Sequence, residues 1–147
     1  MANKPDWLVE YEITLEGQTI TYSYDKEGDI LEIFFQKEGG LGIDLTENIV
    51  LRYNQEDQKP LSLILTDFSH LTRLTKFGPP SFRLTSFATL PPNMQRIVLP
   101  ILNSFPVNHF LKVSGLISSP GGELQPITYF ERPTNLKIRD AETTDLN

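Results

Sequence analysis

The chain contains no cysteine among its 147 residues. This absence excludes disulfide bonds, thiolate metal sites and a cysteine nucleophile. No stretch approaches the roughly 18 consecutive apolar residues of a membrane-spanning helix. The first residues, Met1 to Asp6, lack the apolar core of a signal peptide. We therefore expect a cytoplasmic protein without a membrane partner.

An excess of positive charge is also missing. The sequence has 13 Lys and Arg residues against 19 Asp and Glu residues, a formal net charge of −6. Non-specific binding to nucleic acid needs clustered basic residues that displace counterions. Only Arg73, Lys76 and Arg83, near Phe77 and Phe82, form a small basic and aromatic group, which falls short of such a footprint. We expect no nucleic-acid partner.

Catalytic and cofactor motifs are missing as well. The only histidines are His70 and His109, and no Gly-x-Ser-x-Gly elbow is present. Ser69 adjoins His70, but sequence neighbours do not generally point at one another, and a catalytic pair needs a third, orienting group. His109 opens an apolar run and is interpreted as a partly buried core residue. We predict no catalytic residue and no cofactor.

The segment from Trp7 to Leu15 is the first strong strand pattern. Apolar residues alternate with Glu and Thr, which is typical of a strand with one buried and one acidic face. Gly17 and Gln18 follow, and a glycine in the first position favours a type II′ hairpin turn. The sequence thus predicts an amino-terminal hairpin.

The stretch from Tyr22 to Phe35 is the centre of the prediction. It contains two strand-like runs joined by the polar loop 25–29. Asp25 is placed to accept backbone N–H groups, and Gly28 is expected to take the left-handed conformation of the loop. The second run is apolar on both faces, which predicts a central strand.

Three carboxylates lie in that loop: Asp25, Glu27 and Asp29. A calcium-binding EF-hand loop that began at Asp25 would require Gly at its sixth position and Glu at its twelfth, where this chain has Ile30 and Gln36. We therefore predict solvated carboxylates and no metal site, while the sequence alone leaves cation binding open.

Further strands and one main helix complete the predicted fold. Apolar residues alternate from Ile43 to Tyr53, except at Glu47, and again from Leu61 to Leu65, so residues 7–66 are predicted to form five antiparallel strands in a meander. A helix opens at Pro91–Pro92, is kinked by Pro100 and ends at Pro106. A short helix is expected between Asp67 and Lys76.

The carboxyl-terminal part is predicted to form a second hairpin, from residues 109–117 and 125–131. Residues 133–147 have few apolar groups and are expected to form a flexible acidic tail. The fold class is therefore α+β: an antiparallel meander sheet, a kinked helix on one face and a carboxyl-terminal hairpin, in a single domain of residues 1–132.

The run from Tyr24 to Ile33, with its Tyr-Asp-x-Glu-x-Asp-x-Leu-x-Ile pattern, resembles the opening of a family of small bacterial β-rich proteins of unknown function. Residues 48–54 and 61–65 resemble its later strands, so the resemblance covers residues 22–69. The turn at 56–60 and the long carboxyl-terminal extension depart from the pattern. The resemblance implies a β-rich module without catalytic residues. Some members are thought to be encoded beside small toxin-like proteins, which favours a binding role.

The segment from Phe77 to Leu90 is rich in phenylalanine and proline and lacks any periodicity that would bury it. We therefore predict a non-enzymatic protein-binding or assembly module that acts through protein contacts, with a homodimer as one form of assembly. The alternative is a small-ligand binder or enzyme with a pocket between sheet and helix and His109 at its wall. The predicted protein-binding residues are Phe77, Phe82, Arg83, Phe87 and Leu90.

Overall fold

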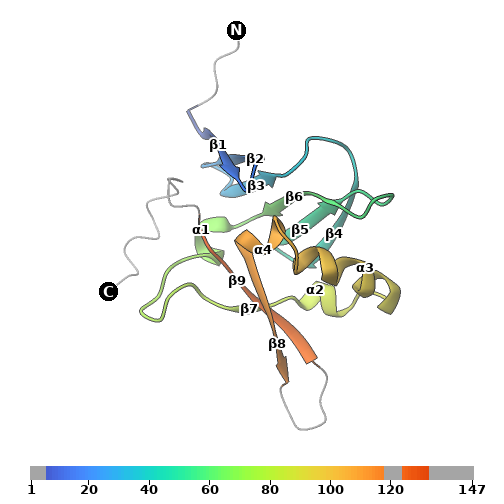
Figure 1. The fold of residues 1–147 in the computed structure, drawn as a ribbon. Coiled ribbons are helices and arrows are strands. Elements are labelled where there is room, and N and C mark those ends of the chain that lie inside the picture. Colours follow the sequence, from blue (N-terminus) through green and yellow to red (C-terminus); the bar gives the residue numbers. More distant parts are fainter. Residues whose placement is uncertain (1–5, 118–123, 133–147) are drawn as a thin grey trace.

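Six antiparallel strands form the main sheet of the computed structural model, which describes residues 6–117 and 124–132 (Figure 1). The predicted tail at 133–147 lies outside the described residues. Across the sheet the strand order is β1-β2-β3-β6-β5-β4. The strands are β1 (Leu8–Leu15), β2 (Gln18–Asp25), β3 (Ile30–Phe34), β4 (Leu41–Thr46), β5 (Ile49–Tyr53) and β6 (Pro60–Leu65).

The sheet consists of two three-stranded meanders that meet where β3 pairs with β6. The prediction of five strands is wrong, because the alternating segment 43–53 is a hairpin of β4 and β5 rather than one strand. The prediction of one continuous meander is wrong as well, because β3 pairs with β6 and not with β4. Glu47, the exception in the pattern, lies in the turn. The Thr46 hydroxyl accepts the N–H of Asn48 at 2.9 Å there, which stabilises the reversal.

The predicted central strand is confirmed, since β3 lies between β2 and β6. Strand alternation places every second side chain on the inner face of the sheet. One row of cross-strand neighbours on this face runs through all six strands and is the floor of the core. The row consists of Tyr11, Tyr22, Ile33, Leu63, Leu51 and Ile43.

Two hairpin turns differ from their predictions. The first is centred on Glu16 (φ 49°) and Gly17 (φ 78°), both left-handed, as in a type I′ turn and not type II′. In the second, Asp29 is left-handed (φ 58°) instead of Gly28. Gly28 contributes in a different way: a Cβ atom there would lie 2.7 Å from an Asp25 carboxylate oxygen, so a larger residue would displace that side chain.

A second layer covers the inner face of the sheet (Figure 1). It contains four helices and a three-stranded sheet of order β7-β9-β8. The helices are α1 (Phe68–Leu71), α2 (Thr85–Ala88), α3 (Pro92–Leu102) and α4 (Val107–Phe110). The strands are β7 (Phe82–Arg83), β8 (Leu111–Ile117) and β9 (Leu124–Phe130).

The predicted main helix starts as expected, with Pro92 in its first turn, but ends at Leu102. Pro106 cannot join a helix interior, and it disfavours helical backbone at the residue before it. The chain leaves α3 through a tighter turn, in which the Ser104 N–H donates to the Ile101 carbonyl at 3.3 Å. His109 then lies in α4, so the prediction that it begins a strand is wrong.

Aromatic side chains join the two layers. The Phe110 ring of α4 meets Tyr22 edge-on, with ring centroids 5.9 Å apart, and stacks on Phe35 at 6.1 Å. The Phe68 ring of α1 contacts Tyr24 at 5.7 Å and Phe130 at 5.5 Å. Pairs of this kind add about 0.5–1.5 kcal/mol each beyond their buried area. The α+β class, with an antiparallel sheet, a covering helix and a carboxyl-terminal hairpin, is confirmed.

Candidate protein-binding site

The five predicted binding residues differ in exposure. Phe77 is 96% exposed and Arg83 is exposed, while Phe82 and Leu90 are half-buried. Phe87 is only 4% exposed and belongs to the core. The expectation that this whole segment stays uncovered is therefore wrong for Phe87, whereas a binding role for Phe77 and Arg83 stays a prediction.

The segment is buried by contacts that have no local sequence signature. Leu84, which follows β7, donates its N–H to the Pro126 carbonyl at 3.1 Å, and its side chain is 1% exposed. The short helix α2 follows and turns Phe87 inward. The partner strand β9 lies more than 40 residues further along the chain. The local sequence pattern therefore could not predict that this segment is buried.

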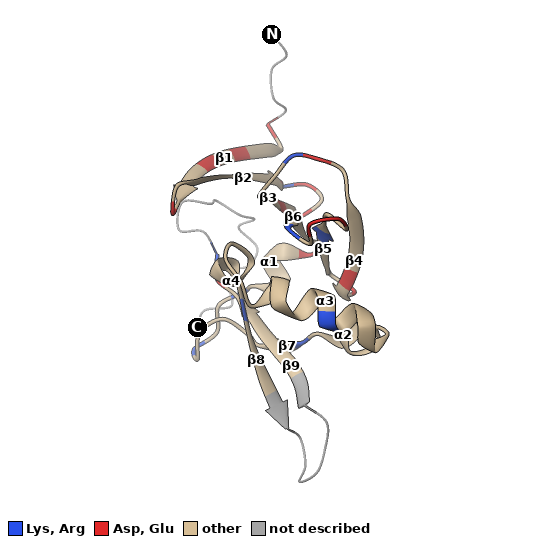
Figure 2. Cartoon of the chain, turned by 45° about the vertical axis from the view of Figure 1, so that its right-hand side comes forward, with Lys and Arg blue, Asp and Glu red and all other residues tan. Residues whose placement is uncertain are grey.

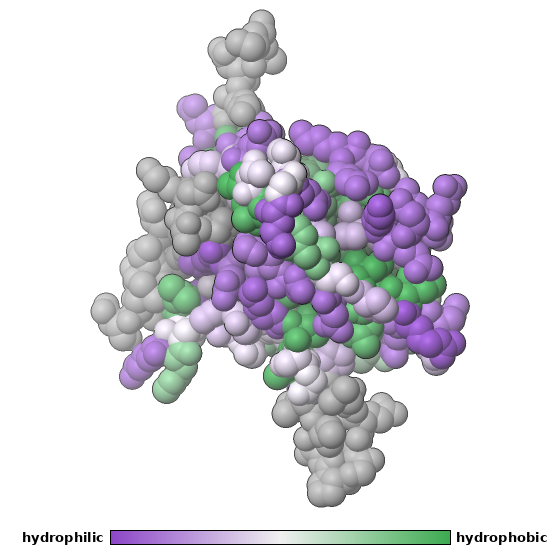
Figure 3. All heavy atoms as spheres, in the orientation of Figure 1, coloured by the Kyte–Doolittle hydropathy of each residue, from purple (hydrophilic) through white to green (hydrophobic). Residues whose placement is uncertain are grey.

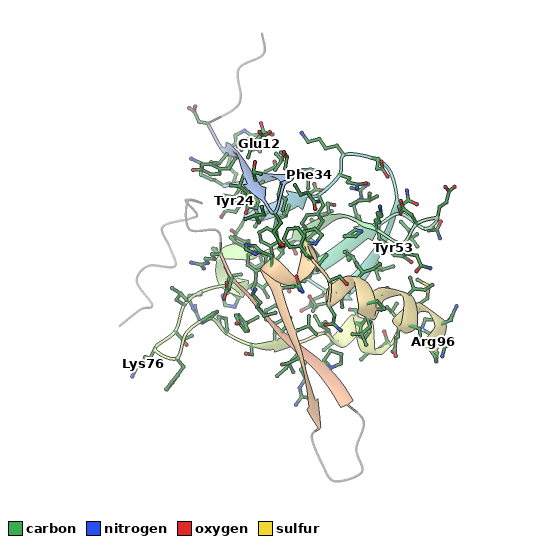
Figure 4. All side chains as sticks on the ribbon, viewed as in Figure 1. Glu12, Tyr24, Phe34, Tyr53, Lys76 and Arg96 are labelled. Carbon is green, nitrogen blue, oxygen red and sulfur yellow. The ribbon has the colours of Figure 1, made fainter. Side chains whose placement is uncertain are left out.

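Phe77 is presented on an ordered turn. The backbone N–H and C=O groups of Thr75 and Gly78 bond to each other at 3.0 and 3.1 Å, and Gly78 has φ 101°. The Thr75 hydroxyl also accepts the N–H of Phe77 at 3.1 Å. Lys76 lies in the same turn, which projects to one side of the molecule (Figure 4). The turn therefore displays one aromatic and one cationic side chain.

A groove of about 560 Å³ lies between α2 and α3 on one side and β8 and β9 on the other. We call it the α3–β8 groove. Hydrophobic atoms gather on this face of the molecule over α2 and α3 (Figure 3). The apolar lining consists of Phe87, Ala88, Pro92, Leu99, Val113 and Pro126, and the remaining lining of Gln95, Arg96, Asn103, Ser114 and Gly115.

Gln95 fixes one wall of the α3–β8 groove. Its side-chain amide lies within hydrogen-bond distance of three backbone carbonyls: 3.2 Å from Phe87, 3.2 Å from Ala88 and 3.1 Å from Leu90. These carbonyls belong to α2 and to the segment after it, so one side chain of α3 holds α2 in place. The groove is consequently preformed, and ordering it on binding costs little entropy.

Leu99 is the groove residue that the sequence could have revealed. It lies outside the apolar stripe by which α3 packs on the core, and it is 39% exposed. An apolar residue on the outer side of an amphipathic helix is a weak signal for a contact surface. Gln95, Val113 and Pro126 carry no such signal, because only the packing of α3 beside β8 brings them together.

Charge is divided between the two layers. Residues 68–122 contain five Lys or Arg residues and no Asp or Glu, whereas residues 1–67 contain 14 Asp or Glu. Acidic residues mark β1 and the edge strand β4, and basic residues mark α3 and the region of β7 (Figure 2). Lys76 and Arg96 lie on opposite sides of the second layer (Figure 4). Arg96 is the charged residue in the lining of the groove.

The acidic loop after β2 is a structural element. Asp25 accepts the N–H groups of Glu27 and Gly28 at 3.0 and 2.8 Å, as predicted. Asp29 is 2% exposed, so the prediction that all three carboxylates are solvated is wrong for this one. Among the residues that the structure describes, no three His, Asp or Glu side chains are grouped as a metal site would require.

The two histidines do not form a buried site. His70 and His109 are both exposed, so the prediction of a partly buried His109 is wrong. The His109 ring packs on Phe105 and Phe110, with centroid distances of 6.5 and 4.9 Å. Neither histidine belongs to the lining of the α3–β8 groove. Their arrangement provides no base beside a nucleophile at this groove.

Comparison of the chain with protein-family models, with curated proteins and with solved structures found no match. The resemblance of residues 22–69 to a bacterial family thus stays a prediction. In the described part of the chain, no helix combines the length and apolarity that a membrane crossing requires.

Proposed function

We propose that the protein is a non-enzymatic binding module that holds a segment of a partner protein in the α3–β8 groove. The observation that carries the proposal is the groove itself, which is lined by both apolar and polar residues and has a wall braced by Gln95. Protein contact sites combine these features, with an apolar centre that excludes water and polar groups around it. Leu99 and Val113 supply apolar area in the groove, and Arg96 and Asn103 supply polar groups.

The alternative of an enzyme or small-ligand site has less support. A groove of this volume would also admit a small molecule. Among the described residues, however, its lining contains one ionisable side chain, Arg96, and no carboxylate, histidine, lysine or tyrosine. General acid–base chemistry needs a group that gains or loses a proton near neutral pH, and an arginine does not. A binding role therefore fits the lining better than catalysis.

A random-peptide display selection on the immobilised full chain tests the proposal. We expect enriched peptides whose affinity falls at least about tenfold in Leu99→Asp, because a carboxylate in the apolar floor would be desolvated by the ligand. Leu74→Asp is the matched control, since Leu74 is 44% exposed but does not line the groove. Selected peptides that bind Leu99→Asp as well as the native chain would contradict the proposal.

The same proposal includes self-assembly, in which the partner is a second copy of the chain. Sedimentation equilibrium measures this directly. A dimer that dissociates in Leu99→Asp and persists in Leu74→Asp would identify a second copy as the occupant of the groove. If the chain is a monomer at all concentrations, the partner is a different protein. The peptides enriched in the display selection then indicate the sequence of the partner segment that binds.

A further inference from the structure

Large apolar side chains are exposed at four places in the described part of the chain: Trp7, Leu74, Phe77 and Leu99. Leu99 lines the α3–β8 groove, whereas the other three lie outside it. A groove and an exposed apolar side chain on the same molecule complement each other when two copies meet. The charge around each of the three side chains decides which of them suits the groove.

The groove offers an apolar surface and one cation to an occupant. Leu99 on α3 and Val113 on β8 both belong to its lining. Arg96 precedes Leu99 by one helical turn and is exposed. It makes no hydrogen bond or ion pair within the part of the chain that the structure describes. An occupant that combines a large apolar side chain with a nearby carboxylate therefore satisfies both features of the groove.

Trp7 is presented on an ordered backbone at the edge of the main sheet. It immediately precedes β1, which is an edge strand. Its carbonyl accepts the Lys26 N–H at 2.7 Å, one residue beyond the Leu8↔Asp25 pair of the β1–β2 ladder. The indole is nevertheless 40% exposed. A tryptophan whose backbone is fixed in this way loses little conformational entropy when a partner covers its ring.

The surroundings of Trp7 carry the charge opposite to that of the groove. Asp6 adjoins Trp7 and is exposed. The loop 25–29, which bonds to Trp7, contains three carboxylates and one lysine. Acidic residues mark β1, whereas basic residues mark α3 (Figure 2). Such a division of charge steers two copies toward each other with β1 of one copy facing α3 of the other.

We infer that the protein associates with itself, and that the α3–β8 groove of one copy binds Trp7 of a second copy. The inference rests on the proposed function and names its partner. The indole packs against Leu99 and Val113, and Asp6 of the second copy lies beside the exposed guanidinium of Arg96. Trp7 does not line the groove of its own chain, so the contact joins two copies. Tryptophan and arginine are enriched among the residues that dominate the energy of protein contacts.

Phe77 and Leu74 suit the groove less well. Phe77 shares its turn with Lys76, so this turn would bring a second cation to Arg96. Leu74 belongs to the same part of the chain, residues 68–122, which contains no Asp or Glu. Trp7 is thus the exposed apolar side chain whose neighbours have the charge that the groove requires.

The fluorescence of Trp7 is the first test, because it is the only tryptophan of the chain. An indole that moves from water into an apolar groove shifts its emission to shorter wavelength. We expect this shift as the concentration of the native chain rises, in step with the mass measured by sedimentation equilibrium. In Leu99→Asp the emission should stay at the wavelength of the exposed indole. A native chain that stays monomeric, or that associates without a change in emission, would overturn the inference.

Variants that remove one side of the contact provide the second test. Trp7→Ala keeps the groove and Leu99→Asp keeps the tryptophan, so each variant alone should associate at least about tenfold more weakly than the native chain. Their equimolar mixture should form a one-to-one complex, because one intact groove and one intact tryptophan remain. A mixture that associates no better than its two components would overturn the inference.

Phe77→Ala is the matched control for Trp7→Ala. It removes the most exposed large apolar side chain of the described residues, which lies outside the groove, and it should associate as the native chain does. Melting curves verify that all three variants fold. The emission of the native chain decides the matter even where a variant fails to fold, because that measurement needs no substitution.

The charge contact is tested by exchanging the two charges. Asp6→Arg and Arg96→Asp should each weaken association about three- to tenfold, since each brings like charges together. The double variant restores opposite charges and should associate within about threefold of the native chain. Arg83→Asp is the control, because Arg83 lies on β7 and does not line the groove. A double variant as weak as the product of the two single effects would overturn the contact of Asp6 with Arg96.

The outcomes separate the inference from the proposed function. Display-selected peptides that depend on Leu99, together with a native chain that stays monomeric, would support a groove-binding module and overturn the second copy as its partner. A selection without any enriched peptide, on a chain that does not associate, would overturn both. Association that shifts the emission of Trp7 and is lost in Leu99→Asp would support both.

Discussion

The carboxylate of Asp29 accepts both the backbone N–H and the hydroxyl of Ser69, a residue 40 positions further along the chain. The N–H lies 3.1 Å from each carboxylate oxygen, and the hydroxyl lies 2.7 Å from one of them. The Tyr24 hydroxyl donates to the same carboxylate at 2.6 Å. One buried side chain in the β2–β3 loop thus holds the start of α1, and with it the approach to the second layer.

Replacing Asp29 by alanine should lower the free energy of unfolding by about 2–4 kcal/mol, because buried donors lose a charged acceptor. Tyr24→Phe and Ser69→Ala should each cost about 1 kcal/mol, since each removes one hydroxyl donor. Asp44→Ala is the control: Asp44 is exposed on β4, and its replacement should stay within about 0.5 kcal/mol. Urea unfolding measures all four, and equal effects of Asp29→Ala and Asp44→Ala would contradict the prediction.

Gly39 and Gly40 should respond oppositely to alanine. A Cβ atom on Gly40 would lie 2.3 Å from a Leu61 methyl group and 2.6 Å from the Tyr53 carbonyl oxygen. Gly40→Ala should therefore cost about 1–3 kcal/mol through overpacking. Gly39 has nothing within 4 Å of that position, so Gly39→Ala should be nearly neutral. Thermal unfolding compares the pair, and similar melting temperatures would refute the close approach.

The first hairpin turn offers a stabilising change. Glu16 has φ 49° and precedes Gly17 at φ 78°. Asn tolerates the left-handed conformation better than Glu, and Asn-Gly is the preferred pair of a type I′ turn. Glu16→Asn should therefore raise the free energy of unfolding by about 0.5–1 kcal/mol. Glu12→Asn, on the exposed side of β1, is the control that should gain nothing. A destabilised Glu16→Asn variant would argue against the type I′ geometry.

Tyr22 gives the fold a dependence on high pH. Burial raises the pKa of Tyr22 from 10.0 to about 12. The unfolded state then loses the tyrosine proton before the folded state does, so stability is complete below about pH 10 and falls as the pH rises toward 12. Unfolding free energies measured between these values should decline less in Tyr22→Phe than in the native chain. Parallel declines would contradict the assignment to Tyr22.

Much of the main sheet was predictable because its signals are local. The alternation from Trp7 to Leu15 and on both sides of the Asp25 loop specifies which side chains face inward, since the period of a strand is two. The apolar residues on both faces of β3 identified a central strand. Pro91 and Pro92 marked the start of α3 for an equally local reason, the fixed φ of proline.

Other features depend on pairings between distant residues. The pairing of β3 with β6, the contact of Asp29 with Ser69 and the pairing of β7 with β9 all join residues at least 28 positions apart. The candidate site is of this kind. Leu99 could be noticed in the sequence, because it is an apolar residue on the outer side of its helix. Val113 and Pro126 carry no such signal, because they reach the groove only through the packing of the hairpin.

The sequence by itself determined most strands of the main sheet, their buried faces, the absence of cysteine chemistry and the division of charge along the chain. Only the tertiary structure decided the strand order, the role of Asp29 and the packing of α2 and α3 beside β8 and β9 that forms the α3–β8 groove. The physical reason is that strand alternation and turn chemistry act between neighbours in sequence. Hydrogen bonding across a sheet and close packing act between neighbours in space, and they fix which strands pair and where a groove remains.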